Sequence, residues 1–232
     1  CLSSSIESKN YLKKLGAKKV KFIGNLKFSH PDNEYLNSDK NLEKFIKSRI
    51  SWCASSTHFN EEKNCGFVHH KLKKKYKNLL TIIIPRHINR VDSILDELNN
   101  MKLKVHLDEP KKTIDPNTDI YLVNSYGKTK LFYKMCKNIF MGGSLIDHGG
   151  QNPLEAVRFG CNILHGPKVA NFREIYAFLR IKKLSIKVNN QNHLSYHLKK
   201  ILNQKNFSKK IVKRINLEGN KILKRTYNII NF

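Results

Sequence analysis

Short apolar runs alternate with stretches of helical periodicity along most of the chain, and this alternation restricts the fold more than any other feature. The clearest run is Leu79–Pro85, where leucine and isoleucine fill a strand-sized segment that a proline ends. Helical patterns precede and follow it, at residues 61–76 and 91–99. Strands that alternate with helices are joined by crossover connections, so their sheet is mostly parallel and covered on both faces. The sequence therefore predicts an α/β fold, a doubly wound parallel sheet in a single domain over residues 1–232.

The same alternation continues from one end of the chain to the other. The predicted strands cover residues 19–26, 52–54, 81–84, 104–107, 119–123, 138–141, 162–164 and 184–188. The predicted helices cover residues 42–50, 61–76, 91–99, 128–136, 153–159, 172–179, 193–202 and 209–229. Residues 110–117 are predicted to form a polar surface loop.

Composition narrows the class of protein. Of the 232 residues, 44 are Lys or Arg and 18 are Asp or Glu, which gives a formal net charge of +26, and 40% are hydrophobic. This apolar content argues against a disordered chain. No apolar run approaches the roughly 18–20 residues that a membrane helix needs. The five cysteines are scattered at spacings that fit neither a disulfide framework nor a zinc site, so we expect reduced thiols and no bound metal.

The positive charge has two interpretations. It either reflects a lysine-rich composition spread over solvated faces, or it serves an anionic partner such as nucleic acid, an acidic membrane surface or a phosphorylated substrate. Charge alone does not choose between them. The chain begins with Cys1 rather than Met, so we expect a piece of a longer or processed protein.

A glycine-rich loop follows the predicted strand at residues 138–141, where an open α/β sheet binds its ligands. The loop contains Ser144 and His148, and a helix follows with Asn152 as its expected N-cap, Pro153 at its first position and Glu155 at its third. Glycines let a ligand approach the backbone, and a helix start favours anions. The alternative is an ordinary capping box, in which Asn152 and Glu155 satisfy backbone donors.

Polar residues also follow the other strands. Arg86 follows Pro85 and has the forked geometry that suits a phosphate, although a surface arginine is equally compatible with the pattern. An N-cap and helix start are expected at residues 124–127. His58 follows small hydroxyl residues, and Lys27 follows the first predicted strand, where it is one lysine among many.

Six short motifs then occur in an order that resembles a known family. They are Gly24-Asn25-Leu26-Lys27-Phe28, Ser56-Thr57-His58 with Glu61-Glu62, Pro85-Arg86-His87, Gly142-Gly143-Ser144-Leu145, Gly149-Gly150-Gln151-Asn152-Pro153-Leu154-Glu155-Ala156, and Gly166-Pro167 followed by Asn171-Phe172. Together they resemble the C-terminal half of the 3-deoxy-D-manno-octulosonic acid (Kdo) transferases that act on lipid A precursor. The resemblance runs from about Cys1 to the end of the chain.

The resemblance implies a GT-B glycosyltransferase, in which two Rossmann-like domains face each other across a cleft. It implies CMP-Kdo as donor, bound by this half, and a phosphorylated lipid A precursor (lipid IVA) as acceptor in lipopolysaccharide biosynthesis. Lys27 is then expected to stabilise the transition state. The residues expected to bind CMP are Pro85, Arg86, Tyr126, Gly127, Lys128, Asn152, Pro153, Leu154 and Glu155. Further residues expected beside the site are Ser56, Thr57, His58, Gly142, Gly143, Ser144 and His148.

Two departures from the family matter. Family members commonly carry an acidic residue at the position of Lys128, so recognition through this side chain is in question. The family's catalytic glutamate and membrane anchor belong to an N-terminal acceptor domain, which we expect this chain to lack. The resemblance places such an enzyme at the cytoplasmic face of the bacterial inner membrane, peripheral or anchored through that N-terminal part. The isolated piece is expected to bind nucleotide weakly, without turnover, and to need no cofactor or metal.

Three alternatives stay open. Another GT-B transferase or a nucleotide-sugar epimerase would share the glycine loop but prefer a uridine or guanosine donor. A nucleic-acid-binding module would cluster lysines with exposed aromatic residues, whereas Tyr121 and Phe140 fall inside apolar strands, so no nucleic-acid partner is expected. A non-catalytic remnant would keep the fold and a basic surface without activity.

Overall fold

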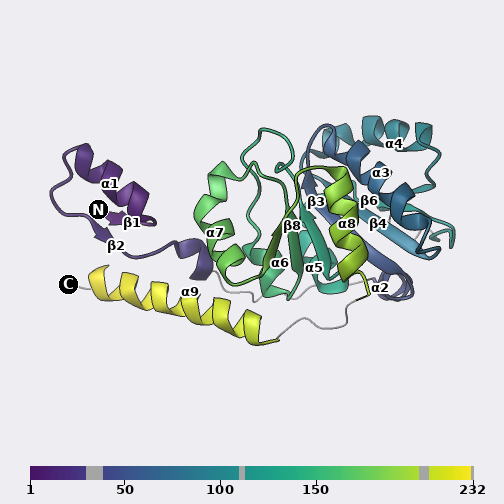
Figure 1. The fold of residues 1–232 in the computed structure, drawn as a ribbon. Coiled ribbons are helices and arrows are strands. Elements are labelled where there is room, and N and C mark those ends of the chain that lie inside the picture. Colours follow the sequence, from purple (N-terminus) through teal and green to yellow (C-terminus); the bar gives the residue numbers. More distant parts are fainter. Residues whose placement is uncertain (30–38, 110–112, 204–208, 231–232) are drawn as a thin grey trace. The chain divides into compact units, whose positions relative to one another are not determined.

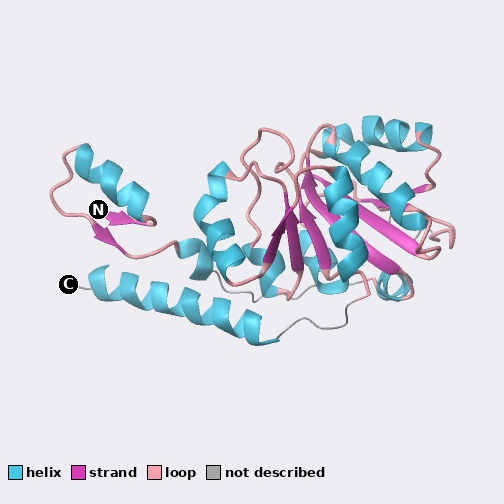
Figure 2. Ribbon diagram, viewed as in Figure 1, coloured by secondary structure: helices cyan, strands magenta, loops and turns pink. Residues whose placement is uncertain are grey.

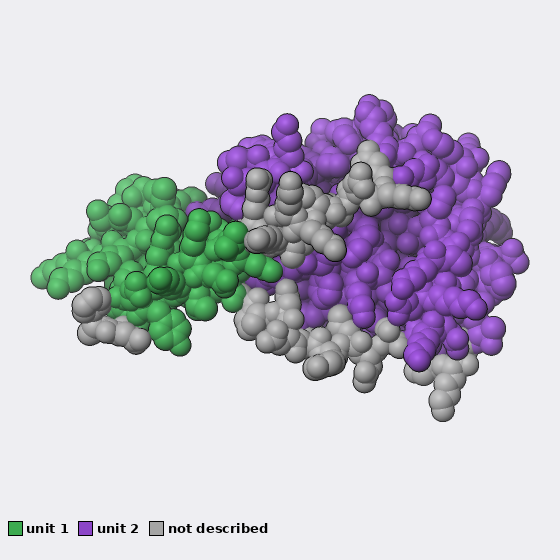
Figure 3. Space-filling model, turned by 90° about the horizontal axis from the view of Figure 1, so that it is seen from below, with its two compact units in different colours: residues 1–35, 208–232 green, residues 36–207 purple. Residues whose placement is uncertain are grey.

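The computed structural model describes residues 1–29, 39–109, 113–203 and 209–230. The chain divides into two compact units (Figure 3), one formed by residues 1–35 and 208–232 and the other by residues 36–207. Each unit is described by itself. The single domain expected over residues 1–232 stays a prediction.

The larger unit is built on a seven-stranded sheet in which every pairing is parallel (Figures 1 and 2). The spatial order is β5-β6-β4-β3-β7-β8-β9. The strands are β3 (Ile50–Thr57), β4 (Leu79–Pro85), β5 (Val105–Leu107), β6 (Ile120–Leu122), β7 (Asn138–Met141), β8 (Asn162–His165) and β9 (Ser185–Lys187). The helices are α2 (Lys40–Lys47), α3 (Glu61–Lys73), α4 (Val91–Asn100), α5 (Thr129–Met135), α6 (Leu154–Arg158), α7 (Arg173–Ile181) and α8 (Gln191–Ile201). The predicted doubly wound parallel sheet is therefore confirmed.

The order of the strands reverses beside β3. From β3 the chain adds β4, β5 and β6 on one side, with β6 between β4 and β5, and later adds β7, β8 and β9 on the other. The loops after β3 and β7 consequently diverge at the carboxyl edge of the sheet. Such a switch point is where doubly wound sheets bind ligands.

Side chains along each strand point alternately to the two faces of the sheet, and both faces are buried. On one face Trp52 and Ala54 of β3 join a core with side chains of α3, α4 and α8, among them Leu72 and Leu98. Cys53, the residue between Trp52 and Ala54, points to the opposite face, because successive strand residues alternate. Each fully buried Leu or Ile contributes roughly 1.5–3 kcal/mol through removal of apolar surface from water.

The amino edge of the sheet is held by buried polar groups. His69 of α3 lies 2.9 Å from the Thr81 hydroxyl and 3.2 Å from the carboxylate of Asp119, which Lys73 also contacts at 2.8 Å. These contacts hold the pKa of Asp119 well below its usual range despite the opposing effect of burial. The guanidinium of Arg49 donates to the carbonyls of Asn78, Leu79, Pro116 and Thr118. These contacts thus stabilise the amino edge of the sheet, which is opposite the edge where doubly wound sheets bind ligands.

The smaller unit differs from the sequence prediction at the start of the chain. The strand expected at residues 19–26 is reduced to β2 (Lys21–Phe22), which pairs with β1 (Leu2–Ser3) in a separate two-stranded sheet. The helix α1 (Ile6–Lys14) was not predicted, and Leu26–Ser29 form the 3₁₀ turn η1. The long helix α9 (Lys209–Ile230), which was predicted, packs against η1. Residues 110–112 of the predicted surface loop lie outside the described residues.

Candidate functional site

A buried carboxylate organises the two loops at the switch point. Glu61, the first residue of α3, is fully buried and accepts four backbone hydrogen bonds. Its Oε2 accepts from the amide N of His58 at 3.0 Å and of Gly143 at 2.6 Å, and its Oε1 accepts from Ser144 at 3.1 Å and Leu145 at 3.0 Å. Burial raises the pKa of Glu61, while the four N–H donors act in the opposite direction. Glu61 therefore ties the turn after β3 to the glycine loop after β7.

The glycine loop follows a path that side chains would block. A Cβ at Gly142 would lie 2.3 Å from the carbonyl oxygen of Ser56, and one at Gly166 would lie 2.0 Å from that of Ser144. Gly143 has φ +63° in the left-handed region. The hydroxyl of Ser144 donates to the Met141 carbonyl and accepts from the Gly166 amide at 2.8 Å. The glycines at residues 142 and 166 are thus explained by close backbone packing, and the glycine at residue 143 by its left-handed backbone.

Three histidines gather over this loop. The ring of His58 lies 3.8 Å from that of His148 and 5.6 Å from that of His87, centroid to centroid. The amide nitrogen of Gln151 lies 3.2 Å from Nε2 of His58. Burial, together with His148, His87, Arg90 and Arg86, lowers the pKa of His58 to about 4. His58 is therefore neutral at pH 7 and sits within the field of the exposed Arg86.

The turns after β4 and β6 bring the other predicted residues to the same edge. The amide of Arg86 donates to the Thr57 carbonyl at 2.9 Å, which fixes the Pro85–Arg86 turn beside the end of β3. Gly127 has φ +83°, and Tyr126 is exposed. The helix α5 starts at Thr129 with Lys128 as N-cap and without a side-chain cap, so the N-cap expected at residues 124–127 is wrong.

Lys128 is held by an acidic partner from a neighbouring strand. Its Nζ lies 2.6 Å from Oδ2 of Asp108, a buried residue after β5. The Tyr121 hydroxyl donates to the other oxygen of Asp108 at 2.7 Å. The pKa of Tyr121 is raised by burial and by this carboxylate. An acidic residue at position 128 would be repelled by Asp108. The lysine found here in place of the family's usual acidic residue therefore suits its neighbour.

The helix in the Asn-Pro-Leu-Glu segment begins one residue later than predicted. Pro153 occupies the N-cap position, α6 begins at Leu154, and Oδ1 of Asn152 accepts from the Leu154 amide at 3.1 Å. Glu155 lies 3.8 Å from Nζ of Lys130 and is partly exposed. Asn152 therefore satisfies a backbone donor, as the capping alternative requires, while Glu155 pairs with a side chain and keeps an accessible carboxylate.

The structure brings together most of the predicted site residues at the carboxyl edge of the larger unit. Those from the ends of β3, β4, β6 and β7 all lie there: Ser56, Thr57, His58, Pro85, Arg86, Tyr126, Gly127, Lys128, Gly142, Gly143, Ser144, His148, Asn152, Pro153, Leu154 and Glu155. Lys27 is an exposed residue of η1 in the smaller unit, so its proposed role stays a prediction.

Sequence reasoning assigned no role to three residues at this edge. Glu61 and Glu62 were noted only as part of a family motif, whereas Glu61 holds the loop and Glu62 forms a bidentate pair with Arg90 at 3.0 and 3.1 Å. Asp108 lies at the end of a strand, a position that could have marked it. Two buried hydroxyls at the same edge, Thr57 Oγ1 and Ser125 Oγ, have no hydrogen-bond partner within the described residues.

The described residues lack two further features. No group of three or more His, Cys, Asp or Glu side chains in residues 1–29, 39–109, 113–203 and 209–230 is arranged to hold a metal ion. In the same ranges no helix combines the length and the apolar character that crossing a bilayer requires.

Comparison with known proteins gives sequence and structural relatives. No family model matches the chain. The Kdo transferase of Haemophilus influenzae is 34% identical over 163 residues, which are 69% of this chain and 38% of that protein. The Kdo transferase of Rickettsia prowazekii is 31% identical over 199 residues, 83% of this chain and 42% of that protein. The chain thus spans about two fifths of the length of these relatives.

The fold matches a solved domain. The C-terminal CMP-Kdo binding domain of WaaA from Acinetobacter baumannii superimposes with a TM-score of 0.66 at 23% identity, covering 79% of this chain and 93% of that one. Similarity at this level of identity shows the shared fold. Sequence relatives and fold agree, and the chain belongs to the Kdo transferases, as a Rossmann-like C-terminal domain of that GT-B glycosyltransferase family.

Proposed function

We propose that this chain is the donor-binding part of a Kdo transferase and binds the CMP portion of CMP-Kdo at the carboxyl edge of the sheet. The observation that carries the proposal is the glycine loop anchored by Glu61 at the switch point, with Arg86 on the adjacent turn. Arg86, whose turn is fixed beside the end of β3 by the Thr57 carbonyl, supplies the charged donor that a phosphate ester requires.

Each proposed role follows from the chemistry of transfer. An acceptor hydroxyl attacks the anomeric carbon of Kdo, the bond from that carbon to the phosphate oxygen breaks, and CMP leaves with the electron pair. Arg86 binds the phosphate and stabilises the charge that develops on it. Glu155 accepts hydrogen bonds from the ribose hydroxyls, as carboxylates do in related nucleotide folds. For Lys27, in the smaller unit, we propose the role that the family resemblance implies, stabilisation of the transition state.

The acceptor and the location are part of the same proposal. A lipid A precursor carries phosphate groups and lies in a membrane, which gives the net charge of +26 an anionic target. The general base and most acceptor contacts are assigned to an N-terminal domain of the family. The enzyme then works at the cytoplasmic face of the inner membrane without a metal or cofactor.

Titration calorimetry of the chain with CMP, UMP and GMP tests the donor assignment. We expect CMP to bind more tightly than UMP and GMP, and at least tenfold more weakly to Arg86→Ala and Glu155→Ala. Arg180→Ala, an exposed arginine on α7, is the matched control and should bind CMP as the parent does. Equal binding of the three nucleotides, or preference for UMP, contradicts the assignment. Preference for UMP would point to a uridine donor, as in the Staphylococcus aureus MnaA–UDP complex, which shares the fold at a TM-score of 0.55 and 12% identity.

A further inference from the structure

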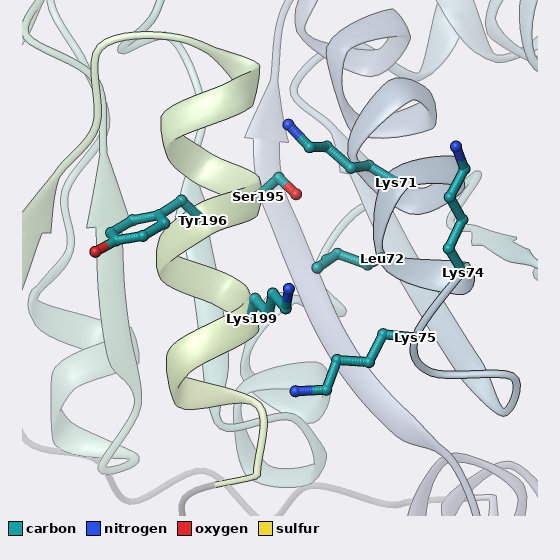
Figure 4. Close-up of a pocket in the computed structure, with 7 residues that line it drawn as sticks. All are labelled: Lys71, Leu72, Lys74, Lys75, Ser195, Tyr196 and Lys199. Atoms are coloured by element: carbon teal, nitrogen blue, oxygen red, sulfur yellow. The ribbon is translucent and has the colours of Figure 1, made fainter.

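A groove of about 560 Å³ lies between α3 and α8, on the larger unit. Its lining residues are Lys71, Leu72, Lys74, Lys75, Ser195, Tyr196 and Lys199. Figure 4 shows Leu72, Lys71 and Lys75 on one wall and Ser195 and Lys199 on the other. The groove therefore places four ammonium groups around a floor formed by Leu72 and the aliphatic parts of the lysines.

The charge of this groove is not balanced locally. Residues 63–91, which include most of α3, contain no Asp or Glu, and neither do residues 175–217, which include all of α8. Within the part of the chain that the structure describes, none of the four lysines forms an ion pair, whereas Lys73 on the same helix pairs with Asp119. Lys71 donates only to the neutral amide oxygen of Asn192, at 3.1 Å. This part of the surface is thus cationic because its lysines gather without acidic partners, and not only because the whole chain is rich in lysine.

The geometry favours an extended anionic surface over a single bound phosphate. The lysines lie at the C-terminal ends of both helices, where backbone carbonyls rather than N–H groups are free. A compact phosphate site needs fixed donors, and lysine is a point charge on a flexible stem. Several such charges above an apolar floor suit a layer of anionic headgroups, which attracts each nearby lysine.

The aromatic side chain beside the groove supports the same partner. Tyr196 of α8 is 52% exposed, and its ring points away from α3 (Figure 4). Nζ of Lys200 lies 4.2 Å above that ring, so one face of the ring is not available for stacking on a base. A tyrosine with an exposed polar tip next to lysines is typical of the bilayer interface.

We propose that the groove between α3 and α8, with Tyr196 at its edge, docks the protein onto an anionic phospholipid surface. This surface assignment rests on the membrane location proposed above and adds a contact made by the donor-binding domain itself. The vesicle assay below contains no nucleotide, so its failure is distinguishable from a failure of CMP binding.

Sedimentation of the full chain with vesicles of 30% phosphatidylglycerol in phosphatidylcholine tests this proposal. The groove variant carries Lys→Glu at positions 71, 74, 75 and 199. The control variant carries Lys→Glu at positions 44, 134, 182 and 187, which are exposed on the same unit, so both variants change the net charge from +26 by −8. We expect the groove variant to bind at least tenfold more weakly and the control less than threefold. Parent binding should fall at high salt and be absent on pure phosphatidylcholine.

Three results overturn the proposal. The first is equal loss of binding in both variants, which would mean that total charge alone matters. The second is unchanged binding of the groove variant. The third is tighter binding of a single-stranded oligonucleotide than of vesicles, lost with the same four lysines. We expect the midpoints of thermal unfolding of both variants to lie within a few degrees of that of the parent. This control shows that a loss of vesicle binding does not come from misfolding. Tyr196→Ala should weaken vesicle binding severalfold even at high salt, because it removes an uncharged contact.

Discussion

At the scale of single residues, Glu61 shows how one side chain can determine the shape of a glycine loop. Its two oxygens accept four backbone N–H groups from both sides of the switch point, with no positively charged partner among those donors. The sequence placed Glu61 in a short motif with Glu62 but gave it no role. The role of Glu61 depends on residues 82 to 84 positions away in the chain, which local pattern does not reveal.

Glu61→Gln should destabilise the protein by about 2–4 kcal/mol, since an NH₂ group would face two N–H donors and charged hydrogen bonds would be lost. Urea unfolding measures this change. CMP affinity should fall as well, because the loop loses its anchor. Glu97→Gln is the control, since Glu97 pairs with Lys63 at 4.0 Å on the surface and should contribute less than about 1 kcal/mol. Similar effects of the two substitutions would contradict the anchoring role.

Lys128 gives a second prediction at this scale. Lys128→Glu places a carboxylate against the buried Asp108, so we expect a loss of about 1–3 kcal/mol in the free energy of unfolding, more than for Lys128→Met. The double variant Lys128→Glu with Asp108→Lys should recover part of this loss. A double-mutant cycle measures the coupling. Additive effects of the two changes would mean that the 2.6 Å contact contributes no net coupling.

At the scale of elements, the sequence predicted the strands and helices of the larger unit well because each one has a clear period. The strand at residues 138–141 matches β7 in both limits, and the other strands of that sheet lie within a few residues of the predicted ranges. The predicted strand at residues 19–26 has suitable composition but only a two-residue neighbour to pair with. Strand formation depends on that neighbour, which a local pattern does not contain.

The packing of α9 on η1 yields a prediction about an element. A Cβ at Gly219 would lie 2.1 Å from the carbonyl oxygen of Phe28, which is backbone and has little room to move. Gly219→Ala should therefore weaken the smaller unit by about 1–3 kcal/mol, although alanine favours helix elsewhere. Asn220→Ala, at the next and exposed position, should be neutral or stabilising. Limited proteolysis measures the rate of cleavage within α9 in the two variants. Equal rates would contradict close packing at Gly219.

At the scale of the whole molecule, some features of the site can be recognised from the spacing of residues in the sequence. Others are contacts that arise only from the topology of the sheet. The motifs near strand ends were visible because glycines, Arg86 and Asn152 are unusual at those positions. The contacts of His58 with His148 and of Lys128 with Asp108 join segments from different strands, and they exist only because the sheet places those strands at one edge. Roles that depend on such contacts require the structure.

Buried neutral histidines make the stability of the molecule depend on pH. His58 and His165 both have a pKa lowered to about 4, chiefly by burial, whereas an unfolded histidine titrates near 6.5. Between those values the unfolded chain binds protons that the folded protein does not, so stability falls as pH decreases from 7 to 4. One such histidine lowers the free energy of unfolding by up to about 2 kcal/mol at pH 5.

His165→Gln should reduce this dependence, because glutamine does not titrate and still offers a donor to the Gly166 carbonyl, which His165 Nδ1 contacts at 2.7 Å. Urea unfolding at pH 7 and pH 5 measures the free energy of unfolding of the parent and of the variant at each pH. We expect the difference in unfolding free energy between these pH values to be smaller in the variant than in the parent. A parent protein that is equally stable at both pH values would mean that His165 and His58 take up protons in the folded state as readily as in the unfolded one.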